Sequence, residues 1–267
     1  MTVWEALFLG LVQGLTEFLP VSSSGHLVIT QFLLGVKEPG ITFEVLVHFG
    51  TLGSIVWVFF PDIKKLAAAG LFLNDDRVSR KLLLLIFLGC IPTGLMGLGF
   101  QPFFVNLFSS VLVVGIMLLV TGSLLWLINW KVPGRKTVEK MKVSDALIVG
   151  LFQGFAIIPG ISRSGATISS ALFRELNRET AIRYSFLLSL PAILGATVLE
   201  GRELLSTGAE NISVVPLALG TVVAFISGVF AIRTLIRVLN AGNLHYFAYY
   251  CWMAGSLVIL WQVVQWT

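Results

Sequence analysis

Charged residues are scarce in this sequence. Only 12% of its 267 residues are Asp, Glu, Lys or Arg, whereas 56% are hydrophobic and the mean hydropathy is +0.91. A soluble domain carries about 25% charged residues, so a water-soluble globular fold is excluded. Apolar stretches close to the roughly 20 residues that span a bilayer recur along the chain. The composition therefore predicts a polytopic α-helical membrane protein. We expect it to interact with the lipid bilayer and not with nucleic acid.

Cysteine is also scarce, and the N-terminus has no basic segment. The two cysteines, Cys90 and Cys251, stand far apart in apolar segments. That isolation favours two buried small side chains over a disulfide or a metal pair. The first residues, MTVWEALF, lack the basic region that opens a secretory signal peptide. We therefore expect no disulfide and no cleaved leader.

Polar side chains gather instead in one stretch near the N-terminus, QGLTEFLPVSSSGH (residues 13–26). Pro20 lacks an N–H and disfavours the helical conformation of its predecessor, so a helix over residues 3–19 should end or kink there. The serines that follow are good helix caps and predict a second helix start. The pattern therefore indicates a broken helix pair with polar groups at the break.

The beginning of the chain recurs in its second half. At a constant offset of 140 residues, nine of the twenty positions from 6 to 25 carry an identical residue without a gap. Composition bias explains scattered Leu and Gly matches, but not the Gln-Gly and Ser-x-Ser-Gly matches together. We therefore predict an internal duplication. Its identical first-copy residues are Ala6, Leu7, Gly10, Leu11, Gln13, Gly14, Ser22, Ser24 and Gly25.

Each copy is expected to hold one broken, re-entrant helix pair and three full spans. The first repeat covers residues 1–135 and the second covers 136–267. The pairs are expected at about 3–36 and 144–173, and the spans at 41–60, 82–101, 108–130, 181–200, 213–232 and 245–266, with a short loop at 101–106. Because three is an odd number, the second copy should be inverted relative to the first. The expected fold is thus an all-α membrane protein of two inverted-topology repeats.

Lysine and arginine set the expected orientation. The loops 61–81, 131–142, 174–183 and 233–244 share one side in this topology. They hold fifteen of the eighteen Lys and Arg residues (five, five, three and two). The positive-inside rule makes that side cytoplasmic. Both termini and the 200–212 loop are therefore expected outside.

The sharpest chemical signal is PGISRSGAT (residues 159–167) in the second copy. Arg163 at bilayer depth is costly without an anionic partner or ligand. Glycines allow close backbone approach, and a helix start offers unpaired N–H groups to an anion. Together with nearby hydroxyls these groups suit phosphate oxygens. The predicted binding residues are Gly160, Ser162, Ser164, Gly165 and Thr167. The alternative is that Arg163 only neutralises Glu17 or Glu44.

The first copy supplies the reactive groups. At the offset of 140, Ser23 of the first copy corresponds to Arg163 of the second. If a two-fold axis in the membrane plane relates the copies, these two side chains face each other. A hydroxyl aimed at a bound phosphate suggests phosphoryl transfer, with Ser23 as nucleophile and His26, at i,i+3, as base or acid. His26 could instead be the nucleophile, or a buried or capping histidine. Helix capping explains Ser22 and Ser24 without a catalytic role. We expect both serines beside the substrate.

Oxygen donors near the break suit a divalent cation. Gln13 and Glu17 share one helix face at i,i+4, and Mg²⁺ or Ca²⁺ prefers such ligands and bridges phosphate oxygens. Gln13 and Glu17 are therefore the expected metal ligands, although Glu17 could instead orient His26. Gln13 is also expected among the substrate-binding residues. Glu44 is a further oxygen donor, and with His48 it has ligand-like spacing that is common by chance.

Together, QGLTEFLPVSSSGH and PGISRSGAT resemble the two signature regions of the bacterial undecaprenyl-diphosphate phosphatases of the bacitracin-resistance family. The resemblance covers essentially the whole chain, and its matched residues are Gln13, Glu17, Ser22, Ser23, His26 and Arg163. It implies hydrolysis of the cell-wall lipid carrier's diphosphate at the outer face of the bacterial plasma membrane. It also implies a divalent cation, inverted repeats with re-entrant helices, and homodimers in some members. Gln13 departs from the pattern, because many members have glutamate there.

A transporter or flippase of a polyprenyl phosphate is the main alternative. Inverted repeats with broken helices at mid-membrane are common in transporters, and the same pocket could move a phosphate without cleaving it. The juxtaposed serine and histidine favour the enzyme, because a carrier needs an anion site but no nucleophile. A structural scaffold would not require Arg163 and Glu17 at membrane depth.

Overall fold

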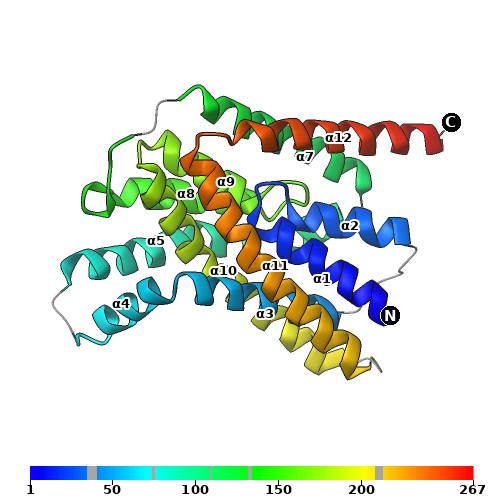
Figure 1. Cartoon of the computed structure of the whole chain (residues 1–267), viewed down its shortest axis with the longest axis horizontal. Helices are drawn as coiled ribbons and strands as arrows, with labels where there is room; N and C mark the ends of the chain where they lie inside the picture. Colours follow the sequence, from blue (N-terminus) through cyan, green and yellow to red (C-terminus); the bar gives the residue numbers. More distant parts are fainter. Residues whose placement is uncertain (35–40, 74–75, 109, 132–133, 208–212, 267) are drawn as a thin grey trace.

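The computed structural model describes residues 1–34, 41–73, 76–108, 110–131, 134–207 and 213–266. These residues form twelve α-helices and one short 3-10 helix (Figure 1). The elements are α1 Val3–Phe18, α2 Ser23–Leu34, α3 Ile41–Val58, α4 Phe60–Gly70, α5 Arg77–Gly99, α6 Gln101–Phe108, α7 Val111–Asn129, η1 Val138–Lys140, α8 Val143–Phe155, α9 Arg163–Phe173, α10 Arg178–Thr207, α11 Val214–Asn240 and α12 His245–Trp266. The all-helical class that the composition predicts is confirmed.

Six elements in the described part of the chain can account for membrane crossing. The helices α5, α7, α10, α11 and α12 are each long and apolar enough to span a bilayer. The pair α3–α4 is also apolar enough when taken together, but it bends by 84° at its break. Pro61 lies in the first turn of α4, where its ring fits a helix start but cannot continue α3. The chain is therefore a multi-pass membrane protein, and the expected span 41–60 ends in a bend.

Several stretches that we expected to be loops are helical. They are 61–70 in α4, 101–106 in α6, 200–207 in α10 and 233–240 in α11. In α11, Leu235 and Leu239 are buried and continue the apolar stripe past Arg233 and Arg237. Charged residues on the opposite face of a helix do not end it. The prediction of these loops was wrong. Where it rested on charge, as in α11, the reason is that charge marks a change of environment and not a helix end.

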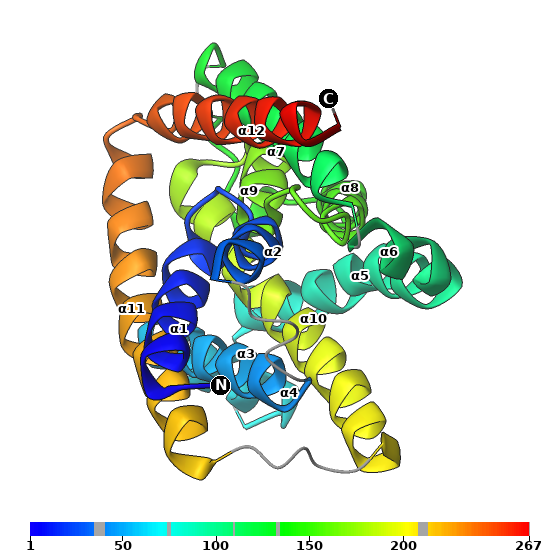
Figure 2. The same cartoon turned by 90° about the vertical axis from the view of Figure 1, so that its right-hand side faces the viewer.

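Two broken helix pairs lie between the long helices. Between α1 and α2, residues 19–22 form what we call the first elbow, and between α8 and α9, residues 156–162 form the second elbow. Figure 2 shows α1, α2 and α9 between α11 on the left and α5 on the right, below α7 and α12. The break expected at Pro20 is present, and the second copy breaks at the corresponding place. These elbows bring the polar motifs into the middle of the molecule.

Glycines allow the broken pairs to pack closely on long helices. At Gly10 a Cβ atom would meet the backbone oxygen of Gly220 in α11, and at Gly150 it would meet the backbone oxygen of Gly89 in α5. Gly10 and Gly150 correspond at the offset of 140. Both copies therefore seat their first broken helix on a long helix through the same kind of contact.

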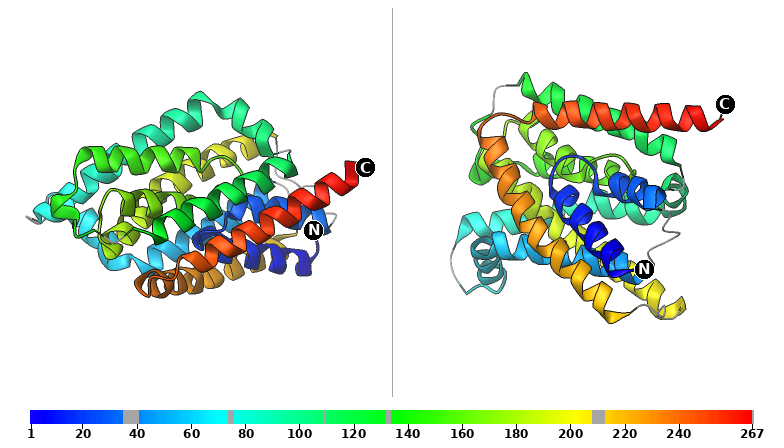
Figure 3. Two further views of the ribbon diagram at one scale, coloured as in Figure 1. Left: turned by 90° about the horizontal axis from the view of Figure 1, so that it is seen from above. Right: turned by 45° about the vertical axis from the view of Figure 1, so that its right-hand side comes forward.

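The two ends of the molecule differ in character. Figures 1 and 3 show both termini at one end, and the α4–α5 turn and the loop before α8 at the other. In that loop, Lys131 and Lys136 donate to the carbonyl oxygens of Phe173 and Arg174, at 2.7 and 2.9 Å. Cations are favourable at a helix C-terminus because of the helix dipole. The basic residues of this end therefore also anchor α9.

Candidate active site

The first elbow places its polar side chains through a left-handed turn at Ser22. The φ of Ser22 is +69°, a conformation that costs a non-glycine residue energy and persists where the surroundings fix it. Its hydroxyl accepts from the N–H of Gly25 at 3.3 Å and from the N–H of Gly160 in the second elbow at 3.1 Å. The two elbows therefore meet, with Ser22 joining them.

The second elbow repeats these local contacts. Ser162 caps α9 by accepting from the N–H of Gly165 at 3.1 Å, the bond that Ser22 makes in the first elbow. The hydroxyl oxygens of Ser162 and Ser164 lie 3.2 Å apart, and those of Ser22 and Ser24 lie 3.3 Å apart. The two elbows therefore make matching hydrogen bonds, and these hydroxyls hold the elbows.

Three backbone amides in and next to the second elbow have protein partners. The N–H of Gly160 donates to Ser22, and that of Gly165 donates to Ser162. The N–H of Ser162 donates to the hydroxyl of Thr121 in α7 at 3.1 Å. These three amides are satisfied within the protein, because an elbow between two helices has to satisfy its own donors first. Anion binding at the start of α9 stays a prediction.

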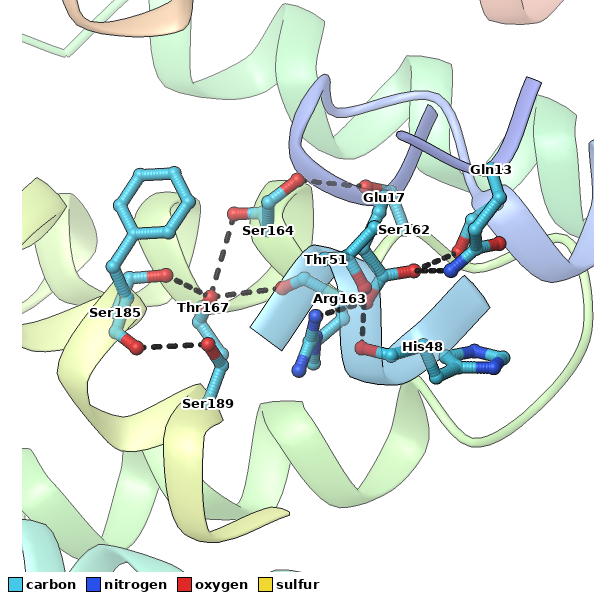
Figure 4. A network of polar contacts seen from close by, with 12 residues as sticks. Gln13, Glu17, His48, Thr51, Ser162, Arg163, Ser164, Thr167, Ser185 and Ser189 are labelled. Atoms are coloured by element: carbon cyan, nitrogen blue, oxygen red, sulfur yellow. Dashed lines mark hydrogen bonds and ion pairs between the residues drawn. The ribbon is translucent and has the colours of Figure 1, made fainter. Parts of the chain in front are cut away.

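The carboxylate of Glu17 is the centre of the site. One of its oxygens, Oε1, pairs with Nη2 of Arg163. The other, Oε2, accepts from the hydroxyl of Ser23 at 2.5 Å and from the amide of Gln13 at 3.1 Å. Figure 4 shows Gln13 and Arg163 approaching Glu17 from different elements. Four of the predicted residues, from both copies, are thus brought together around one carboxylate.

The Glu17–Arg163 pair is largely withdrawn from solvent. The side chains are 6% and 18% exposed, so neither charge could remain there alone without a large desolvation cost. The alternative partner, Glu44, instead accepts from Nε2 of Gln31 at 3.1 Å. Arg163 is the first residue of α9, and its guanidinium has further N–H donors beyond the one that contacts Glu17. The pair therefore leaves Arg163 able to bind phosphate oxygens.

His26 does not lie where we expected it. Its Nδ1 lies 2.8 Å from the carbonyl oxygen of Ser22, and its Nε2 lies 2.7 Å from the hydroxyl of Tyr250 in α12. Ser23 turns to Glu17 and not to His26. A spacing of i,i+3 puts two residues on one face, but a histidine near a helix start can turn back to the carbonyl four residues earlier. The expected direct pairing of Ser23 with His26 was wrong, and Glu17 takes that place.

A small cavity adjoins the Glu17–Arg163 pair. It is lined by Phe18, Phe186 and four hydroxyl residues, namely Ser164, Thr167, Ser185 and Ser189. Thr167 donates to the carbonyl of Arg163 at 2.8 Å and lies 2.5 Å from the hydroxyl of Ser185 (Figure 4). Ser185, Ser189 and Tyr250 were not singled out from the sequence. Their signal was available, because each is a polar residue within an apolar span.

The donors for a divalent cation are few. Oε1 of Gln13 is buried and has no hydrogen-bond partner among the described residues, so it is free to ligate. The described residues contain no group of three or more His, Cys, Asp or Glu side chains that could hold a metal. The Nδ1 of His48 lies 2.8 Å from the backbone carbonyl of Glu44, so the two side chains form no joint site through that nitrogen. Gln13 and Glu17 fit a cation that takes its other ligands from phosphate and water.

The fold and the site define a class of protein. The chain is a multi-pass helical membrane protein in which two broken helix pairs bring a hydroxyl, a carboxylate and an arginine together. The model of one family, described as "Bacitracin resistance protein BacA", matches residues 6–257. The chain belongs to this family.

Curated relatives cover the whole chain. An undecaprenyl-diphosphatase of Alkaliphilus metalliredigens is 48% identical over 275 residues, which include 99% of this chain and 100% of the relative. One of Halothermothrix orenii is 48% identical over 260 residues, covering 97% and 98%. A third, of Desulforapulum autotrophicum, is 45% identical over 273 residues, covering 97% and 98%. The resemblance found from the two motifs is therefore confirmed along the full length.

Proposed function

We propose that this protein is a membrane phosphatase that hydrolyses undecaprenyl diphosphate to undecaprenyl phosphate and inorganic phosphate. Near-identity in length and 48% identity to undecaprenyl-diphosphatases support the substrate. The observation that carries the chemistry is the placement of Ser23 and Arg163 on the two oxygens of one buried carboxylate. A nucleophile, a base and an anion-binding group within one site are the parts that phosphoryl transfer needs.

Ser23 is the proposed nucleophile and Glu17 its base. The Ser23 oxygen forms a bond to the terminal phosphorus while its proton passes to Oε2 of Glu17, 2.5 Å away. The anhydride P–O bond breaks, and undecaprenyl phosphate leaves. Water then attacks the phosphoserine, the bond from phosphorus to the serine oxygen breaks, and Glu17 returns its proton to Ser23. One water proton passes to His26 and then to solvent, and the other remains on the released phosphate.

Arg163 binds the phosphate oxygens in this scheme. Protonation of Glu17 removes the negative charge that pairs with Arg163, so the guanidinium can interact more strongly with the phosphoryl group as the reaction proceeds. The positive charge of Arg163 therefore stabilises the negative charge that develops on the phosphoryl group in the transition state. This gives Arg163 a purpose beyond neutralising a buried carboxylate.

A divalent cation, Mg²⁺ or Ca²⁺, is proposed beside Gln13 and Glu17, where the unpartnered Oε1 of Gln13 would hold it together with the ionised carboxylate, before Glu17 takes the proton of Ser23. When bound it would offset the charge of the diphosphate oxygens. The unpartnered Oε1 of Gln13 supports this assignment, and Glu17 is the only carboxylate of the motif. A single carboxylate implies that the diphosphate itself supplies part of the ligand set.

We further propose that the two halves are inverted repeats and that the site opens to the outer face of the plasma membrane. Support comes from the matching elbow contacts, the matching glycine crossings and the charge of the loops. An outward site would recycle a lipid carrier released after cell-wall export. A homodimer stays a prediction.

Phosphate release by purified protein in detergent tests the function. We expect release from undecaprenyl diphosphate, and loss of release with a chelator. Ser23→Ala should abolish turnover, and a trapped phosphoenzyme should be acid-stable and base-labile. The control is Thr221→Val, which removes a hydroxyl that donates to a carbonyl of its own helix α11.

Two outcomes would contradict the scheme. Substrate binding without phosphate release would make the protein a carrier of the lipid. Retained activity in Ser23→Ala together with an inactive His26→Ala and an acid-labile adduct would make His26 the nucleophile.

A further inference from the structure

Tyr250 stands in α12, 224 residues after His26, and touches it in two ways. Its hydroxyl lies 2.7 Å from Nε2 of His26, and the two rings stack with centroids 5.6 Å apart and planes 14° apart. The next residue, Cys251, contacts the carbonyl oxygen of Pro20 at 3.6 Å. Two consecutive residues of α12 therefore hold the first elbow and its histidine.

The contacts fix the protons of His26. The carbonyl of Ser22 can only accept a hydrogen bond, so Nδ1 carries the hydrogen. In a neutral imidazole the other nitrogen is then an acceptor, so the hydroxyl of Tyr250 donates to Nε2. If Nε2 becomes protonated, the phenol oxygen can accept in turn. The contact with Tyr250 is thus compatible with both charge states of His26.

Only one nitrogen of His26 is available for proton exchange. Because Nδ1 is held by the backbone, any proton that His26 takes up or gives away passes through Nε2 beside Tyr250. Tyr250 is 40% exposed, whereas the side chains of Glu17 and Arg163 are 6% and 18% exposed.

We infer that Tyr250 is a positioning residue of the phosphatase, which holds the ring of His26 and directs its Nε2. The inference rests on the proposed function. It gives α12, at the end of the second repeat, a part in the chemistry of the first elbow. His26 then exchanges protons through Nε2, while Glu17 accepts the proton of Ser23.

The chain offers a matched control in the adjacent tyrosine. Tyr249 is 49% exposed, and its ring packs against Trp126 and Trp252, at centroid distances of 5.5 and 6.2 Å. Tyr250→Phe and Tyr249→Phe remove the same atom from neighbouring positions of one helix, and each keeps its ring. A loss of activity in Tyr250→Phe but not in Tyr249→Phe would therefore be due to the hydroxyl that faces His26.

The kinetic test compares phosphate release from undecaprenyl diphosphate. For Tyr250→Phe we expect kcat to fall about tenfold, a fraction of the 10²–10⁴ that a positioned acid–base group contributes, with KM within twofold because Arg163 is unchanged. Tyr249→Phe should stay within twofold in both. In a His26→Ala background, Tyr250→Phe should cause no further loss. An unchanged kcat in Tyr250→Phe, or a second loss of similar size in that background, would overturn the inference.

A chemical test needs no turnover. Diethyl pyrocarbonate modifies unprotonated imidazole nitrogens, and mass spectrometry separates the three histidines of the chain. We expect His26 to react several-fold faster in Tyr250→Phe than in the wild type or Tyr249→Phe, with His48 and His245 unchanged. An equal rate for His26 in all three proteins would refute the contact. Absence of phosphate release by the wild type would refute the proposed function alone, because the labelling still decides the role of Tyr250.

Discussion

Replacing Arg163 by lysine separates the two roles of its guanidinium. Lysine keeps the positive charge beside Glu17, so the buried pair retains most of its attraction. It loses the planar fork that contacts two phosphate oxygens at once. The pair is only 18% and 6% exposed, so the donors act in a site that excludes most water. Removal of one such preorganised donor costs about 2.7–4 kcal/mol, or roughly 10²–10³ in kcat.

The stability effects should follow a different order. Arg163→Lys should unfold near the wild-type temperature. Arg163→Ala leaves the carboxylate of Glu17 buried without a cationic partner, which costs about 3–5 kcal/mol. Adding Glu17→Gln to Arg163→Ala should recover part of that stability without recovering activity. Phosphate release and thermal unfolding in the same detergent measure the two quantities.

The opposite end of the same helix provides the control. Arg174 follows α9, and its Nε donates to the buried carboxylate of Asp145 at 2.7 Å. Arg174→Lys makes the same change to an arginine–carboxylate pair outside the site, and should keep turnover within a few-fold. Near-normal turnover in a folded Arg163→Lys protein would refute the reasoning and reduce Arg163 to a structural partner of Glu17.

The membrane orientation, the cation site and one glycine crossing can each be tested by substitution. A single cysteine at Thr137, in a protein without Cys90 and Cys251, should resist an impermeant thiol reagent in intact cells, whereas one at Thr2 should react; the reverse pattern would invert the orientation. Gln13→Glu should lower the Mg²⁺ concentration for half-maximal activity, because a carboxylate replaces the unpartnered amide oxygen, and an unchanged value would place the cation elsewhere. Gly150→Ala should destabilise the fold by about 1–3 kcal/mol because its Cβ meets the backbone of Gly89, while Gly94→Ala, which meets nothing within 4 Å, should not; equal unfolding temperatures would contradict the crossing.

The sequence was sufficient for those parts of the fold that depend on local signals. Pro20 and the following serines predict the break before α2, and the repeat at offset 140 predicts the second break. Helix ends were less predictable where charge was the only signal, as at Arg233 and Arg237 in α11. Such residues reach solvent from a continuing helix.

The site was predictable in its members but not in their pairing. Gln13, Glu17, Ser23 and Arg163 do meet, because the two motifs fall at breaks that the fold brings together. The partner of His26 could not be found from its own helix. Tyr250 reaches it only through the packing of α12 on the first elbow, which no spacing within residues 13–26 encodes.

One exchanged position explains why two similar elbows make a single site. The flanking serines form the same caps in both copies, so the backbone is held alike. Between them, the first copy has Ser23 and the second has Arg163, and these two side chains occupy opposite oxygens of Glu17. Neither elbow is complete alone, because the first would leave a buried carboxylate unpaired and the second a buried guanidinium. Association of the halves and assembly of the site are therefore the same event.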